Sequence, residues 1–169
     1  MDPVSRHALI ALQKVERRKR TGQLTHEELV ALRDAQRPTP CKTGAAHFEI
    51  DIARQVLFYV DETGKVAKIL PVSTGHGRAY NENGQRGVAH TPCGTFRVYR
   101  KINGWRRSAL GLLYYPCYIF EGFAIHGSPS VPAFPASHGC VRIRMFAAAE
   151  ISKLATVGMV VIVYNSASS

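Results

Sequence analysis

A cysteine and two histidines stand in one short stretch of this sequence, residues 124–144, which reads AIHGSPSVPAFPASHGCVRIR. Cys140 directly follows Gly139, and His126 lies upstream across a loop that contains three prolines. The thiolate is the nucleophilic form of cysteine, and a free thiol with a pKa of ~8.5 is mostly protonated at neutral pH. An imidazole within hydrogen-bond reach can take the proton. These residue types predict nucleophilic catalysis by Cys140, with His126 as general base and then general acid.

The backbone around Cys140 suits the same chemistry. Gly139 allows the chain to turn sharply and to approach a ligand closely. The amides of Cys140 and its neighbours are then candidates to hold an oxyanion. No aspartate or asparagine near the motif is placed to orient the imidazole, so we assign that role to the backbone carbonyl of Gly127. For His138 we expect a part in shaping the oxyanion loop or in contacting substrate rather than in proton transfer.

Two simpler interpretations of these residues compete with catalysis. A lone cysteine is most often a small buried hydrophobe. His138 and Cys140 are also potential metal ligands, but a structural zinc site needs four ligands, often with paired CxxC spacing. Neither a CxxC nor an HxxxH pattern occurs in the chain. We therefore predict no metal and no cofactor.

The two motifs, His126-Gly127-Ser128 and the SHGCVR block of residues 137–142, resemble the L,D-transpeptidase (YkuD-type) catalytic domain. That family carries a His-Gly-Ser/Thr followed by Ser/Thr-His/Lys-Gly-Cys-hydrophobic-Arg/Asn. Weaker matches flank the motifs at residues 72–75 and 91–96 and in the closing strand, 158–164. The resemblance covers roughly residues 46–165. A cysteine–histidine pair alone would be weak evidence, because such signatures do not transfer between families.

The resemblance implies a mainly β catalytic domain over residues 46–165, of β-sandwich or barrel-like form. It also implies peptidoglycan stem peptides as substrates. The donor would be a tetrapeptide stem cleaved before its D-alanine, the acceptor the side-chain amine of diaminopimelate on another stem, and the product a 3-3 cross-link. Acylation of Cys140 by carbapenems is implied as well. We assign substrate binding to residues beside the motif and in nearby aromatic segments, namely Ser128, Ser137, Arg142, Tyr114 and Trp105.

Other interpretations of these residues remain open. Arg142 suits a stem carboxylate, but a structural salt bridge is the alternative, and aromatic residues in strands more often belong to a core. The same site could hydrolyse its thioester and act as an L,D-carboxypeptidase. The chain could also be a non-catalytic wall-binding protein, although the intact motifs argue against a decayed site.

The amino-acid composition limits the classes of molecule that the chain is expected to bind. The chain has 169 residues, a net charge of +10 and 46% hydrophobic residues, enough for a sizeable core. The positive charge predicts a polyanionic neighbour. We favour the anionic cell wall over nucleic acid, because the chain has no helix-turn-helix, RNP-type aromatic motif or zinc finger. No apolar run is long enough to span a membrane. The oligomeric state is not indicated.

The sequence begins with a basic helical segment rather than a secretory signal. The charges of its first residues follow the apolar part instead of preceding it. The family resemblance nevertheless predicts an extracytoplasmic location, in the periplasm or cell wall.

The sequence of residues 1–40 predicts two helices. Asp2-Pro3 suits the start of the first helix. Before the second, Thr25 and Glu28 form a capping box, with Leu24 and Leu29 at the positions of a hydrophobic staple. This segment resembles the latter half of a peptidoglycan-binding helical module, which normally has three helices. A helical brace packed on the catalytic domain is an equal alternative.

The remaining elements follow from hydrophobic alternation and turn residues. We expect strands at 47–53, 55–60, 66–72, 94–100, 114–120, 123–126 and 159–164, a helix at 145–155, long loops at 73–92 and 103–113, and a tail at 166–169. Cys93 and Cys117 fall in strands that we expect to be neighbours, so we predict a disulfide between them, as suits an oxidising compartment. Two buried thiols are a nearly equal alternative.

Overall fold

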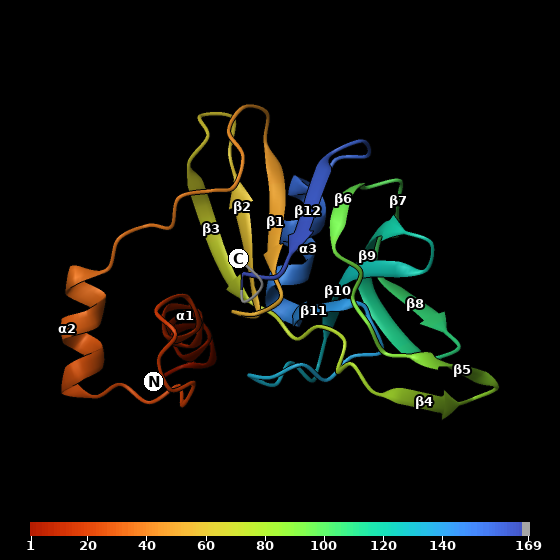
Figure 1. Ribbon diagram of the computed structural model, residues 1–169, viewed down its shortest axis with the longest axis horizontal. Helices are drawn as coiled ribbons and strands as arrows, with labels where there is room; N and C mark the ends of the chain where they lie inside the picture. Colours follow the sequence, from red (N-terminus) through yellow and green to blue (C-terminus); the bar gives the residue numbers. More distant parts are fainter. Residues whose placement is uncertain (167–169) are drawn as a thin grey trace.

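The computed structural model describes residues 1–166 and is mainly β (Figure 1). One sheet has the strand order β3-β2-β1-β12-β6, and a second has the order β11-β10-β9-β7 with β8 paired to β9. The first sheet contains β1 (His47–Asp51), β2 (Val56–Val60), β3 (Val66–Pro71), β6 (Gly94–Arg97) and β12 (Val160–Tyr164). The second contains β7 (Arg100–Lys101), β8 (Trp105–Ser108), β9 (Gly111–Phe120), β10 (Phe123–Ser128) and β11 (Val141–Arg144). The two sheets pack together without closing into a barrel, so the sandwich form of the expectation holds.

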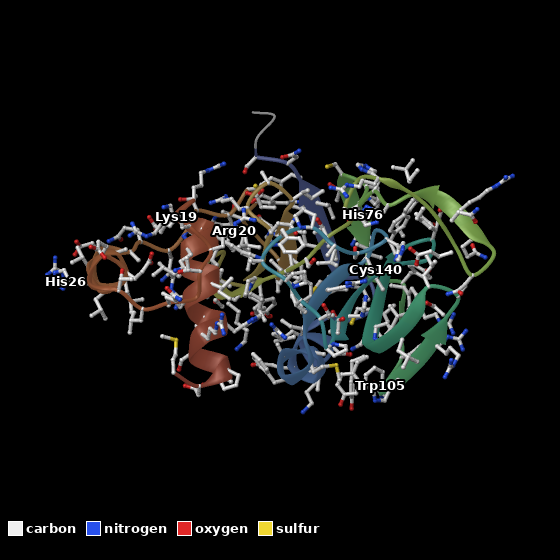
Figure 2. All side chains as sticks on the ribbon, turned by 90° about the horizontal axis from the view of Figure 1, so that it is seen from below. Lys19, Arg20, His26, His76, Trp105 and Cys140 are labelled. Carbon is white, nitrogen blue, oxygen red and sulfur yellow. The ribbon has the colours of Figure 1, made fainter. Side chains whose placement is uncertain are left out.

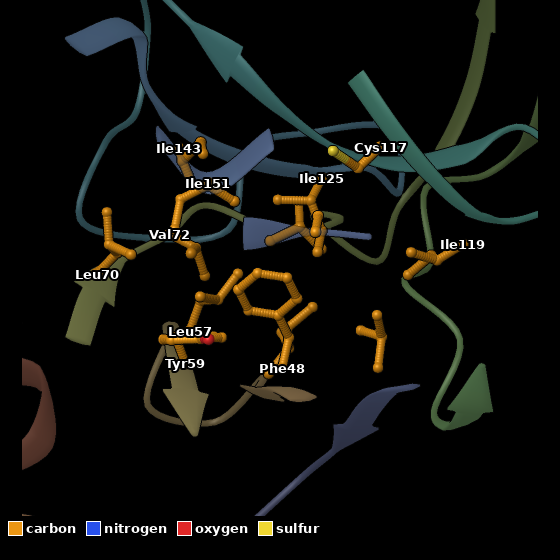
Figure 3. Packing of buried hydrophobic residues seen from close by; sticks show 14 of the residues in the cluster. Phe48, Leu57, Tyr59, Leu70, Val72, Cys117, Ile119, Ile125, Ile143 and Ile151 are labelled. Carbon is orange, nitrogen blue, oxygen red and sulfur yellow. The ribbon is translucent and has the colours of Figure 1, made fainter. Parts of the chain in front are cut away.

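The core lies between the two sheets. Phe48 and Ile50 of β1 are fully buried, and so are the polar residues that alternate with them, because this strand is covered on both faces. Across the interior they meet side chains of the second sheet, including Ile125 of β10, and Ile151 of helix α3 (Met145–Leu154) (Figure 3). Burying a side chain of this size stabilises the fold by about 1.5–3 kcal/mol. This shared core fixes β10, which carries the His126-Gly127-Ser128 motif, and β11, which begins directly after Cys140.

The N-terminal segment is docked on the first sheet. Helix α1 (Pro3–Val15) lies beside β3, whereas α2 (His26–Asp34) stands farther out (Figure 1). The ammonium of Lys14 is buried and donates to the carbonyl of Val72 at 2.7 Å. Arg20 donates to the carbonyls of Ala133 and Ala53. These bonds attach the end of α1 and the residues after it to the backbone of residues 53, 72 and 133 in the rest of the chain.

Helix α2 begins with half of the predicted capping box. The Thr25 hydroxyl accepts the Glu28 amide at 3.3 Å. The Glu28 carboxylate pairs instead with Arg18 at 3.1 Å. Leu24 and Leu29 stay about half exposed, at 48% and 50%, so they bury little of the surface that a staple would cover.

Both predicted long loops contain strands, and those predictions were wrong. Residues 73–92 include a hairpin of β4 (Ala79–Glu82) and β5 (Gln85–Val88). Its turn residues Asn83 and Gly84 have φ angles of +50° and +75°, as an Asn-Gly type I′ turn requires. Residues 103–113 form β8 and the beginning of β9. The strands of the hairpin are largely exposed and β8 is fully so, which explains why hydrophobic alternation did not reveal them.

The predicted disulfide is absent from the structure, in which Cys93 and Cys117 are free thiols. Cys93 is exposed and directly precedes β6 of the first sheet, and Cys117 is buried in β9 of the second. The expectation failed because the two strands belong to different sheets. The alternative of two buried thiols holds only for Cys117.

Among residues 1–166, no helix is long and apolar enough to cross a membrane.

Candidate active site

Parallel pairing of β10 with β11 brings the two motifs together. Ile125 pairs with Val141 and His126 with Arg142. Cys140 immediately precedes β11, so this register sets it beside the strand that carries His126. Both residues line a groove of about 770 Å³. In Figure 2, Cys140 lies between the segment carrying His76 and the strand carrying Trp105.

The imidazole of His126 is 5% exposed and is oriented by its own strand. Nδ1 lies 2.9 Å from the carbonyl oxygen of Gly127, the contact expected from the sequence. A carbonyl only accepts, so Nδ1 carries the hydrogen and Nε2 keeps its lone pair. Burial lowers the pKa of His126 to about 4; the Gly127 carbonyl opposes this shift and the charge of Arg142 adds to it. The ring is therefore a neutral base at neutral pH.

The thiol of Cys140 is held in its protonated form at rest. Burial raises the pKa of the thiol, and the backbone of Ala124 and the charge of Arg142 offset only part of that effect. Sγ lies 3.8 Å from the carbonyl oxygen of Gly122. A thiol in this state would need a base to become a nucleophile, and the neutral imidazole of His126 lines the same groove.

Two glycines allow this close packing. A Cβ on Gly127 would lie 2.7 Å from the Cβ of Ala148. Gly139 has a φ of +139°, and a Cβ there would lie 2.4 Å from the ring of Phe123 and 2.9 Å from the carbonyl oxygen of His90. The fold thus requires glycine at both positions that the sequence assigned to catalysis.

Ser137 lies inside the loop and braces it. The side chain is 1% exposed, and its hydroxyl donates to the Cys140 carbonyl at 2.5 Å while accepting the Gly139 amide at 3.0 Å. Thr91 adds a second support by donating to the Gly139 carbonyl at 2.7 Å. Ser137 therefore shapes the cysteine loop, and because it also lines the groove, its predicted contact with substrate stays a prediction.

His138 points to the β4–β5 hairpin. Its Nε2 lies 3.2 Å from a carboxylate oxygen of Glu82. Its ring makes edge contacts with Tyr80, at 4.8 Å between centroids, and His76, at 5.8 Å. The side chain thus joins the cysteine loop to the hairpin, and because it also lines the groove, both roles predicted for His138 stay open.

The other residues assigned to substrate binding divide into two groups. Ser128, Arg142 and Trp105 line the groove, and Trp105 is 52% exposed. Arg142 is in no ion pair among residues 1–166, so its guanidinium is open to a carboxylate. Tyr114 is not among the residues that line the groove; its ring packs against that of Trp105 at 4.8 Å. Tyr114 therefore supports Trp105.

Sequence reasoning missed the residues of the hairpin that border the groove. Tyr80 lines it, and Glu82 contacts His138. The Asn83-Gly84 pair was the available signal, because it predicts a hairpin at this point. Phe123 and Gly122 also line the groove and gave no sequence signal, since a turn glycine and a strand aromatic are common.

In the part of the chain that the structure describes, no group of three or more histidine, cysteine or acidic side chains is placed to hold a metal ion.

Comparison with known proteins identifies the family. The model of the L,D-transpeptidase catalytic domain (YkuD) matches residues 45–163. The chain therefore belongs to the YkuD L,D-transpeptidase family, an enzyme family. No curated protein matches the chain.

Solved structures share the fold. An L,D-transpeptidase from Xylanimonas cellulosilytica is 36% identical with a TM-score of 0.86, covering 94% of this chain and 79% of that one. An L,D-transpeptidase from Stackebrandtia nassauensis is 19% identical with a TM-score of 0.60, covering 98% and 80%. One from Mycobacterium smegmatis is 21% identical with a TM-score of 0.58, covering 70% and 58%.

The Xylanimonas match covers more than the catalytic region alone, so the likeness includes part of the N-terminal segment. That segment is helical, and the family model does not extend to it.

We expect Gly139→Ala to lower stability and to abolish reaction at Cys140. The new Cβ would collide with Phe123 and with the His90 backbone, and the φ of +139° is strained for alanine. Thermal unfolding and intact mass after carbapenem exposure measure the two effects. Gly77→Ala is the matched control, because Gly77 also has a positive φ, of +76°, but open space around it. Equal behaviour of the two variants would contradict the close packing described at Gly139.

Proposed function

We propose that this chain is a cysteine-dependent L,D-transpeptidase that forms 3-3 cross-links between peptidoglycan stem peptides, outside the cytoplasm. The observation that carries the proposal is the neutral His126, oriented by Gly127, beside Cys140 in one groove. Family membership supplies the substrate class. The net charge of +10 supports an anionic wall as its surroundings.

In the acylation step, Nε2 of His126 takes the thiol proton as Sγ of Cys140 attacks the carbonyl carbon before the terminal D-alanine. A carbon–sulfur bond forms and the carbonyl oxygen becomes an oxyanion. When the tetrahedral intermediate collapses, the carbon–nitrogen bond breaks. His126 returns the proton to the leaving amine, so D-alanine departs and a thioester remains.

In the second step, the acceptor amine attacks the thioester and gives a proton to His126. The carbon–sulfur bond breaks, an amide forms, and the proton returns to the sulfur. Water can resolve the same thioester. Transfer therefore requires an aligned acceptor, and alignment can supply an effective molarity of ~10⁵ M or more.

The oxyanion needs donors that are not already engaged. The Gly139 amide is taken by the Ser137 hydroxyl. The amides of His138 and Cys140 are the candidates that remain in the loop, and preorganised donors of this kind contribute about 2.7–4 kcal/mol each. Arg142 in the groove suits a stem carboxylate.

The groove is lined by enough side chains to bind two stem peptides. The Trp105–Ser108 strand, with Arg106 and Arg107, and the β4–β5 hairpin, with Tyr80, border it on one side. Residues 128–130 border it at another point, next to prolines that limit the freedom of the loop. A hydrolase requires only one stem-binding face.

We expect cross-linked dimers when disaccharide-tetrapeptide is incubated with the protein and products are resolved by mass spectrometry. Dimers that disappear with Cys140→Ser would support transfer. Tripeptide without any dimer over a range of substrate concentrations would replace transfer with L,D-carboxypeptidase activity. Unchanged substrate would contradict both.

A further inference from the structure

A second cavity, of about 600 Å³, lies between helix α1, the proline-rich loop and the beginning of α3. It touches the catalytic groove only through Ser128 and Pro129, which border both. Apolar side chains, among them Ile10, Val131 and Phe146, form part of its wall. The catalytic steps above use none of its other residues.

Three arginines line this cavity: Arg6, Arg20 and Arg144. Arg20 and Arg144 donate to backbone carbonyls, at Ala133 and Ala53 and at Pro129 respectively. None of the three is in an ion pair within residues 1–166, and no acidic residue lines the cavity. Three arginines that line one cavity without a counter-charge favour an anionic ligand.

The beginning of α3 adds backbone donors to the same wall. The N-cap residue of this ten-residue helix is Arg144, and no side chain caps the helix there. No acidic residue occupies its first turn. Met145 and Phe146, the first helical residues, line the cavity. An uncapped helix start leaves amide hydrogens without partners and favours negative charge.

His7 is a buried polar residue that borders the same cavity. Its side chain is 9% exposed, and Nε2 is buried without a hydrogen-bond partner. The ring meets the Phe146 ring edge-on at 5.2 Å and borders the cavity. Burial first, and then the charges of Arg144 and Lys14, lower the pKa of His7 to about 4. The electrostatic potential around His7 is therefore positive, and a bound anion would reduce it.

We propose that this second cavity binds an oxyanion, a carboxylate or a phosphate group, of the polymer on which the protein acts, beside the catalytic groove and separate from it. The volume exceeds what one small ion fills, and the apolar wall suits the chain that carries the anion. The site itself follows from the residues of α1 and α3. Only the source of the oxyanion rests on the proposed function.

Amide NMR of the full chain tests the site directly. Inorganic phosphate and acetate are titrated at constant ionic strength, and glycerol phosphate and disaccharide-tetrapeptide follow, the last with Cys140→Ser to prevent turnover. We expect saturable shifts at the amides of residues 145–147 with both simple ions. Tighter binding of tetrapeptide than of acetate identifies a stem carboxylate as the source. Tighter binding of glycerol phosphate than of inorganic phosphate identifies a phosphate-bearing polymer.

Arg6→Gln and Arg144→Gln are each expected to weaken phosphate binding by about tenfold, because each removes one charge-assisted contact. Arg6 is exposed and is the safer variant for folding. Arg33→Gln is the control for net charge, since Arg33 lies on α2 and pairs with Asp34. Shifts that do not saturate, or an equal effect of all three variants, would overturn the proposal. The readout lies at α3, so failure of this site and failure of transpeptidation give different results.

Discussion

Replacing Cys140 with serine is expected to reduce covalent acylation by a carbapenem by about 10³-fold or more, while the protein still folds. The resting site holds a neutral thiol beside a neutral imidazole whose pKa is about 4. A base that weak can assist a thiol, but it is poorly matched to the much less acidic hydroxyl of serine. Intact mass against time measures the adduct, and thermal unfolding confirms that the variant folds.

Cys93→Ser is the matched control, because Cys93 is an exposed free thiol away from the groove. It is expected to acylate at the wild-type rate. An adduct that forms equally fast on Cys140→Ser would remove Cys140 from the nucleophilic role. Loss of the adduct in the Cys93 variant would move that role to the other thiol.

The orientation of His126 was predictable from the sequence because its partner is local. Gly127 follows His126 directly, so a carbonyl that orients the ring could be named without a structure, and the bond is present at 2.9 Å. Gly139 was likewise marked by its residue type. The structural reason why glycine is required there is a positive φ together with close contacts to Phe123 and His90. These contacts involve parts of the chain that only the fold brings near.

Sequence reasoning could not predict the tertiary contacts of these side chains. Tyr114 was assigned to substrate, yet it does not line the groove and its ring packs against Trp105; Ser137 does line the groove, and its part in bracing the cysteine loop was not predicted. Residue type does not reveal whether a serine or a tyrosine faces a groove or the backbone beside it. The disulfide prediction was wrong for a similar reason, because the order of strands along the chain does not determine which sheet each strand joins.

The N-terminal segment shows the same limit. Asp2-Pro3 predicted the start of α1, and capping residues predicted the start of α2. The buried bond from Lys14 to Val72, and the cavity formed by α1 with α3, pair residues far apart in sequence. No periodic pattern in α1 predicts such partners, because they depend on which sheet face the helix covers.

His126→Gln is expected to lower the rate of acylation by about 10²–10⁴-fold, the usual contribution of a general base. The pH profile is also expected to change. In the wild type His126 is neutral above its pKa of about 4, so the rate stays nearly flat from about pH 5.5 to 8 and falls as acid protonates the ring. Without the base, reaction needs spontaneous ionisation of a thiol whose pKa burial has raised. The residual rate then rises about tenfold per pH unit over the same range.

The measurement is the acylation rate of each variant by intact mass between about pH 4.5 and 9, with thermal unfolding as a check on folding. His138→Gln is the discriminating comparison, because His138 is the other histidine of the motif and pairs with Glu82 rather than with the thiol. It is expected to keep the flat profile, with a smaller loss of rate. A flat profile in His126→Gln together with a rising one in His138→Gln would mean that His138, and not His126, is the general base. A wild-type rate that climbs steadily with pH would mean that His126 does not act as the base, since the neutral imidazole is present throughout that range.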